Sequence, residues 1–151
     1  MGRMQRAVHV VGVGMIPFTK PGASEPYTVM GAKAAALALK DAGLDYAEVQ
    51  QAYVGYVYGD STAGQAAIYG VGLTGIPVFN VNNNCSTGSS ALFLARQAVE
   101  SGMVECAIAL GFELILRQEK IFPLRHRHRF FFEERKVFGQ SRKLGFAGLF
   151  F

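Results

Sequence analysis

Short apolar runs, rich in β-branched and aromatic residues, alternate with helix-forming stretches over residues 1–113. The runs lie at 7–13, 49–58, Val78 to Val81 and 106–110. Strands that alternate with helices at this spacing form βαβ units, in which right-handed crossovers join parallel strands. The pattern therefore predicts an α/β fold with a mostly parallel sheet and the element order βαβαβαβ.

Three helix-forming stretches separate these runs. The first, from Thr28 to Ala42, is rich in alanine, begins at a residue suited to N-capping and is followed by Gly43, a frequent helix terminator. The second covers 62–72, and the third follows Cys85 and continues to about residue 101. The alanine content of the first helix predicts close packing against a neighbouring element.

The third predicted helix carries no charged residue between Ser86 and Ala95. A helix without a polar face is usually buried on all sides. One sheet in a domain of 113 residues covers one side only. The sequence therefore predicts a larger surrounding structure, without which Leu92, Phe93 and Leu94 keep an uncovered face.

A change in composition marks a boundary after Glu113. Residues 1–113 contain six Lys/Arg and eight Asp/Glu, a net charge of −2, whereas residues 114–151 contain nine and three, a net charge of +6. The second segment also holds eight of the twelve phenylalanines. We therefore expect a partial domain over 1–113 and, over 114–151, a basic, Phe-rich tail of unrelated sequence that is poorly ordered.

The chain has no run of eighteen apolar residues and no secretory signal pattern. These features predict an intracellular protein without a membrane span, in which Cys85 and Cys106 are free thiols. In the tail, Arg125 to Arg129 alternates arginine with His126 and His128 before three phenylalanines. No nucleic-acid-binding motif frames this run and no further metal ligand accompanies the histidines, so we predict neither nucleic acid nor metal as a partner.

Cys85 is the residue with the clearest chemical potential. It follows a strand and a polar Asn82-Asn83-Asn84 corner and precedes a helix, where the positive end of the helix dipole favours the thiolate. Backbone N–H groups at such a turn can also stabilise an oxyanion. The local pattern leaves two readings equally open: a nucleophile for acyl transfer, or an ordinary buried cysteine.

Several segments carry a family resemblance. They are GYVYGDST (55–62), GQ (64–65), GIP (75–77), VNNNCSTGSSAL (81–92) and AIALGFE (107–113). Together they resemble the thiolase family, in its branch of 3-oxoacyl-CoA thiolases of the sterol-carrier type, from about Val8 to Glu113. The resemblance implies a layered thiolase-like fold and favours the nucleophile reading of Cys85.

The resemblance implies an acyl-CoA C-acyltransferase acting on 3-oxoacyl-CoA through a cysteine acyl-enzyme at Cys85. Coenzyme A is then a substrate; no bound cofactor, cofactor-binding residue or metal is expected. The family's catalytic histidine, second cysteine and oxyanion motif lie in later sequence and have no counterpart here, His9 being placed in the first strand and Cys106 in an apolar one. The alternative is therefore an inactive fragment that associates with full-length thiolase subunits.

The resemblance also implies a homodimer and a peroxisomal location. The chain ends in Leu149-Phe150-Phe151 instead of a peroxisomal address, which keeps the cytoplasm open as the location. The sequence does not determine the acyl-chain preference, because the family's substrate-binding loop is not among these residues. Nor does it determine whether a lipid-transfer domain belongs to the same gene product.

Overall fold

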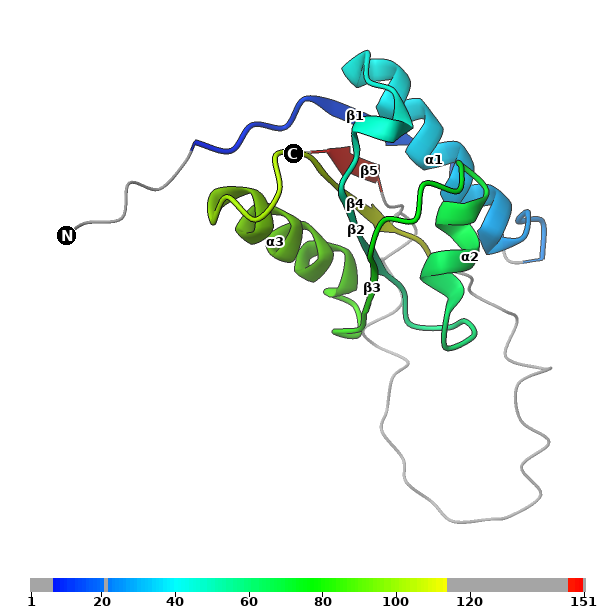
Figure 1. Cartoon of the computed structure of the whole chain (residues 1–151). Helices are drawn as coiled ribbons and strands as arrows, with labels where there is room; N and C mark the ends of the chain where they lie inside the picture. Colours follow the sequence, from blue (N-terminus) through cyan, green and yellow to red (C-terminus); the bar gives the residue numbers. More distant parts are fainter. Residues whose placement is uncertain (1–6, 21, 114–146, 151) are drawn as a thin grey trace, which may run out of the picture.

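The computed structural model describes residues 7–20, 22–113 and 147–150 (Figure 1). The elements are β1 (Gly12–Met15), α1 (Tyr27–Ala42), a 3-10 turn (Tyr46–Glu48), β2 (Gln51–Gly55), α2 (Ala63–Tyr69), β3 (Val78–Val81), α3 (Thr87–Glu100), β4 (Ala107–Gly111) and β5 (Ala147–Phe150). The five strands form one sheet in the order β1-β5-β4-β2-β3. The predicted α/β class and the strand–helix alternation over 1–113 are confirmed.

The central strands are parallel, as predicted. β2 pairs with β3 on one side and with β4 on the other, so that Gly55 lies opposite Val81 and Gly111. These three residues end their strands at one edge of the sheet, called here the carboxyl edge. In Figure 1 this edge faces downward.

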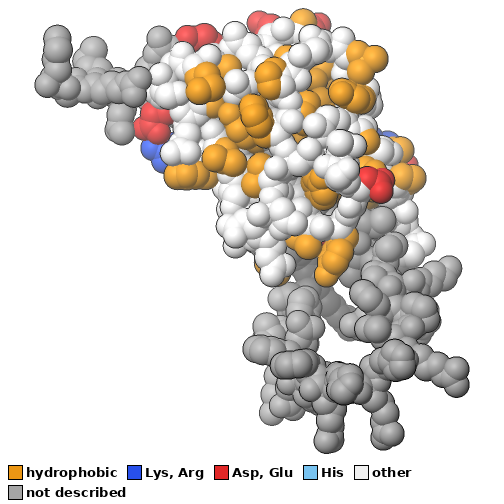
Figure 2. Space-filling view, turned by 60° about the horizontal axis from the view of Figure 1, so that its bottom comes forward, with side chains coloured by type: hydrophobic (Ala, Val, Ile, Leu, Met, Phe, Trp, Pro, Cys, Tyr) orange, Lys and Arg blue, Asp and Glu red, His pale blue; other side chains and the backbone are white. Residues whose placement is uncertain are grey.

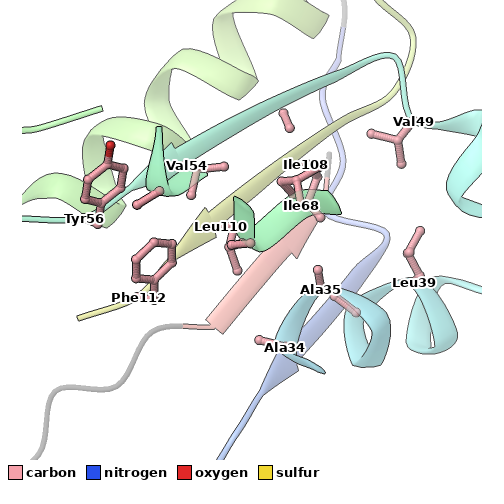
Figure 3. Packing of buried hydrophobic residues seen from close by; sticks show 14 residues of the cluster. Ala34, Ala35, Leu39, Val49, Val54, Tyr56, Ile68, Ile108, Leu110 and Phe112 are labelled. Atoms are coloured by element: carbon pink, nitrogen blue, oxygen red, sulfur yellow. The ribbon is translucent and has the colours of Figure 1, made fainter. Parts of the chain in front are cut away.

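Helices cover the two faces of the sheet unequally (Figure 1). α1 and α2 pack together on one face, whereas α3 alone lies on the other, against β2 and β4. The face under α1 and α2 holds the larger core. Ile68, Ile108 and Leu110 are its largest buried aliphatic side chains, each at most 1% exposed, and they point toward one another between helix and strands (Figure 3).

The face under α3 is built from small residues. Ala107 and Ala109 of β4 lie against Ala91, Ala95 and Ala98, which repeat along one side of α3 at helical spacing. Small side chains on both elements let a helix backbone approach a sheet closely.

The opposite side of α3 is uncovered within the described part of the chain. Phe93 is 55% and Leu94 36% exposed, and Leu92 is half-buried. The prediction that these side chains keep an uncovered face is confirmed. Figure 2, in which the bottom of Figure 1 comes forward, shows hydrophobic side chains spread over the face in view, with most charged ones near its margin.

The first strand differs from its prediction. β1 covers Gly12–Met15 instead of 7–13, and its partner is the antiparallel β5. Gly12 and Gly14 face α1, whereas Val13 and Met15 point away from it and are about half exposed. The apolar run at 7–13 therefore overlaps the strand only at its end, and the strand itself is covered on one face only. Its outward Val13 N–H donates to the Asp41 carboxylate at 2.9 Å, which satisfies part of an otherwise open sheet edge.

The last residues of the predicted tail form a strand of the sheet, β5. β5 pairs antiparallel with both β1 and β4 and so fills the position between them. The other tail residues, including His126 and His128, lie outside the described residues. The boundary after Glu113 stays a prediction.

The contact between β1 and α1 generates a stability prediction. A Cβ atom on Gly12 would lie 2.5 Å from the Ala38 carbonyl oxygen of α1, so Gly12→Ala must push strand and helix apart. We expect the free energy of unfolding to fall by about 1–3 kcal/mol in urea titration. Val13→Ala is the matched control, because that side chain is 50% exposed, and it should change stability by roughly 0.5 kcal/mol or less. Equal effects of the two variants would contradict this account.

Candidate active site

The segment between β3 and α3, residues 82–86, forms a tight polar corner at the carboxyl edge of the sheet. Two backbone hydrogen bonds close it: Ser86 N–H donates to the Asn83 carbonyl at 3.0 Å, and Thr87 N–H donates to the Asn84 carbonyl at 3.1 Å. The Asn82 side-chain oxygen accepts from the Asn84 N–H at 3.1 Å. The asparagine run therefore supplies the side-chain acceptor that a turn of this kind needs.

Asn84 adopts a left-handed backbone conformation, with φ of 51°. It is the only non-glycine residue with positive φ in the described part of the chain. Asparagine enters this region more readily than most residues with a side chain, which explains its presence directly before Cys85. The reversal of chain direction at Asn84 sets the course of the backbone into Cys85 and α3.

Cys85 lies in this corner, two residues before the first residue of α3, and is exposed. The thiol is therefore not buried, and its role as a nucleophile stays a prediction. Its Sγ lies 4.0 Å from the Asn84 side-chain oxygen, a long contact that leaves the sulfur accessible. Within α3, which is described throughout, the first turn has no acidic side chain to offset the positive end of the helix dipole. The corner thus offers an accessible thiol beside a positive helix end.

A second group of contacts fixes the loop after β2 beside this corner. Tyr56 N–H donates to the Val81 carbonyl at 3.3 Å, which joins the start of the loop to the end of β3. The Glu113 carboxylate accepts from the N–H groups of Val57 at 3.0 Å and Tyr58 at 3.2 Å. In the sequence, Glu113 stands out only as the acidic end of the AIALGFE segment, two residues after a buried strand.

Three stacked aromatic rings support the loop after β2. Phe112 lies between Tyr27 and Tyr56, with ring centroids 5.3 Å apart in both pairs. The Tyr27 hydroxyl donates to Asp60 at 3.0 Å, and this hydrogen bond, followed by burial and the Asp60 charge, raises the Tyr27 pKa. Tyr27 therefore stays protonated and keeps this bond across the neutral pH range. These contacts hold the loop, and they bring no second nucleophile to Cys85.

Cys106 lies at the opposite edge of the sheet. It directly precedes β4, at the amino ends of the parallel strands, and its N–H donates to the Gln50 side chain at 3.3 Å. Burial, and secondly the Glu48 charge, raise the pKa of its thiol. Cys85 and Cys106 are both free, as predicted. Because the two cysteines lie at opposite edges, Cys106 is not available as a partner for Cys85.

The other sequence-predicted groups are not brought to the corner. His9 is exposed and precedes β1 instead of lying within the first strand, because the pairing with β5 begins only at Gly12. Among the described residues, no three His, Cys, Asp or Glu side chains are grouped as metal ligands. No helix in the same part of the chain has the length and apolarity needed to cross a bilayer.

Comparison with known proteins places this geometry in context. Residues 8–148 match the family model of the thiolase N-terminal domain. Sterol carrier protein 2 of Gallus gallus is 62% identical over 112 residues, covering 73% of this chain and 20% of its own length. A benzoylsuccinyl-CoA thiolase subunit of Thauera aromatica is 37% identical over 114 residues, 74% of this chain and 29% of its own length.

The fold is also shared with solved structures. An acetyl-CoA acetyltransferase from Syntrophomonas wolfei superposes with a TM-score of 0.61 at 22% identity, over 66% of this chain and 27% of that protein. This likeness shows the fold. The chain spans about a fifth of the length of the sterol carrier protein it matches.

The contrast between the two cysteines generates a labelling prediction. A raised pKa keeps more of the Cys106 thiol protonated at any given pH, and only the thiolate reacts with alkylating reagents. With limiting iodoacetamide at neutral pH, peptide mass spectrometry should find Cys85 labelled before Cys106. The difference should narrow as the pH rises and Cys106 ionises. Faster labelling of Cys106 would show that Cys85 is not accessible in solution.

Proposed function

Because this chain belongs to the thiolase family through its match to the N-terminal domain, we propose that it supplies the acyl-accepting cysteine of a thiolase-type acyltransferase, with Cys85 as the nucleophile. The observation that carries the proposal is the position of Cys85: an exposed thiol between β3 and α3, at the carboxyl edge of a parallel sheet. Ligands of open α/β sheets bind at this edge.

The proposed reaction has two half-reactions that share one intermediate. In the first, the Cys85 thiolate attacks the C3 carbonyl of a 3-oxoacyl-CoA, and the bond between C2 and C3 breaks. The two-carbon fragment leaves as the enolate of acetyl-CoA and takes up a proton, while the remaining acyl group stays on the sulfur. In the second, the thiolate of coenzyme A attacks this thioester, and the Cys85 thiolate is released.

The α3 N-terminus supports the first half-reaction electrostatically. Attack on the carbonyl develops negative charge on its oxygen, and the positive end of a helix stabilises such charge. The small residues that open α3, Gly88 and Ser89, leave space for an acyl group beside the sulfur. The proton taken up by the enolate must come from a group that the corner does not supply, and we propose that later thiolase sequence supplies it.

The substrate class follows from the relatives. One relative is by name a CoA-ester thiolase and another an acetyl-CoA acetyltransferase, so we propose CoA thioesters as substrates and coenzyme A as the acyl acceptor. The relatives named sterol carrier proteins support a lipid-metabolic role. We propose a peroxisomal location, as the family resemblance implies. A fluorescent fusion of the full gene product, imaged against a peroxisomal marker, tests the location.

The uncovered side of α3 supports association with further thiolase structure. Phe93 and Leu94 are apolar and exposed on a helix that lacks charge over residues 86–95. Burying such a surface against protein is favourable by about 25 cal/mol per Å². We propose that a second thiolase half or a full-length subunit covers it, in a homodimer or a mixed assembly.

An acylation assay tests the proposal without the missing acid–base groups. A simple acyl-CoA can acylate Cys85 directly: a bond forms between Sγ and the carbonyl carbon, the bond from that carbon to the CoA sulfur breaks, and CoA leaves. We expect intact-mass and peptide mass spectrometry to find one acyl group on Cys85 after incubation with acetyl-CoA. Cys85→Ala should abolish the adduct.

Cys106→Ala is the matched control, because Cys106 lies at the other edge of the sheet, and it should leave the adduct intact. An adduct that persists in Cys85→Ala would refute the nucleophile assignment. Absence of any adduct in the unaltered chain would instead favour the alternative, a catalytically inactive fragment.

A further inference from the structure

Thr87, the first residue of α3, differs in burial from the corner that precedes it. It is 4% exposed and is the only buried residue with a polar, non-aromatic side chain in the described part of the chain. Residues 82–86, which precede it, are all exposed. A buried hydroxyl is costly unless it is hydrogen-bonded, so its contacts indicate what it does.

The Thr87 hydroxyl forms a hydrogen bond with the backbone of Asn83, on the other side of Cys85 in the sequence. Its oxygen accepts the backbone N–H of Asn83 at 2.8 Å, while the Asn83 carbonyl accepts the N–H of Ser86 at 3.0 Å. Both backbone polar groups of Asn83 are thus bound to the start of α3. Cys85 lies inside this closed loop, two residues from each end.

The methyl group of Thr87 fixes the same residue to the sheet. A Cβ atom on Gly55 would lie 2.6 Å from the Thr87 Cγ2 and 2.7 Å from its carbonyl oxygen, so the side chain rests directly on the glycine backbone. Gly55, the last residue of β2, pairs with Val81 of β3 on one side and with Gly111 of β4 on the other. The methyl therefore rests on a strand that is paired on both sides.

We propose that Thr87 is a positioning residue for Cys85: from a side chain seated on β2, its hydroxyl holds the corner that carries the thiol. This role deepens the proposed function, and it rests on Cys85 being the reacting group. Thr87 acts through the backbone and touches no substrate.

The left-handed Asn84 explains why the corner needs such an anchor. A φ of 51° is less favourable than the ordinary regions and persists only when the surroundings fix it. The Thr87 hydroxyl binds the residue before Asn84, and the Asn84 carbonyl accepts the Thr87 N–H at 3.1 Å. Without the hydroxyl, the corner can relax and carry Cys85 away from the end of α3.

Two variants of similar size separate the hydrogen bond of the Thr87 hydroxyl from the packing of its methyl group. Thr87→Val keeps the methyl on Gly55 and loses the acceptor, whereas Thr87→Ser keeps the acceptor and loses the methyl. The measurement is the rate of Cys85 alkylation by iodoacetamide at neutral pH. Cys106, in the same molecule, reports general loosening of the fold.

We expect Thr87→Val to slow Cys85 alkylation at neutral pH by about fivefold or more, because the corner loses the acceptor that holds the Asn83 N–H. Thr87→Ser should restore most of the unaltered rate, and Cys106 should react equally in all three proteins.

Three results would overturn the role of Thr87: an unchanged rate of Cys85 alkylation in Thr87→Val, an equal loss in Thr87→Ser, or a parallel rise in Cys106 labelling that reveals a generally loosened fold. Alkylation does not depend on acyl transfer. Failure of the acetyl-CoA assay would therefore count against the proposed function and leave this result standing.

Discussion

The start of α3 lies so close to the end of β2 that no side chain fits on Gly55. The Thr87 backbone and methyl occupy the space that this glycine leaves. Along the rest of the interface, alanines of α3 lie against alanines of β4. The Cys85 corner depends on this contact, because residues 82–86 join β3 to the helix seated there.

The carboxyl edge is held from the other side by a separate set of contacts. The Glu113 carboxylate binds two backbone N–H groups of the loop after β2, and the stacked rings of Tyr27, Phe112 and Tyr56 support that loop. Because Tyr56 also donates to Val81, loop and corner form one connected surface. A site with a nucleophile at this edge is thus supported by a loop that several contacts hold in place. The acid–base groups of such a site are not among the described residues.

Within the described residues, the helices cover the two faces of the sheet unevenly. α1 and α2 bury a full aliphatic core on one face, whereas on the other face α3 presents Phe93 and Leu94 to the outside. A chain that covers about a fifth of a sterol carrier protein relative is expected to leave such a surface for further sequence. The chemistry proposed for Cys85 is accordingly the half that a single thiol can perform.

The sequence by itself determined the strand–helix alternation, the thiolase resemblance and the choice of Cys85, because periodicity, turn residues and a specific motif are local signals. β3 was placed to the residue, since Pro77 and the asparagine run bound it. The extent of β1 and its exposed face were decided by pairing with β5, a partner distant in sequence. Likewise, the roles of Thr87, Gly55 and Glu113 arise from contacts between separate elements, which no local pattern encodes.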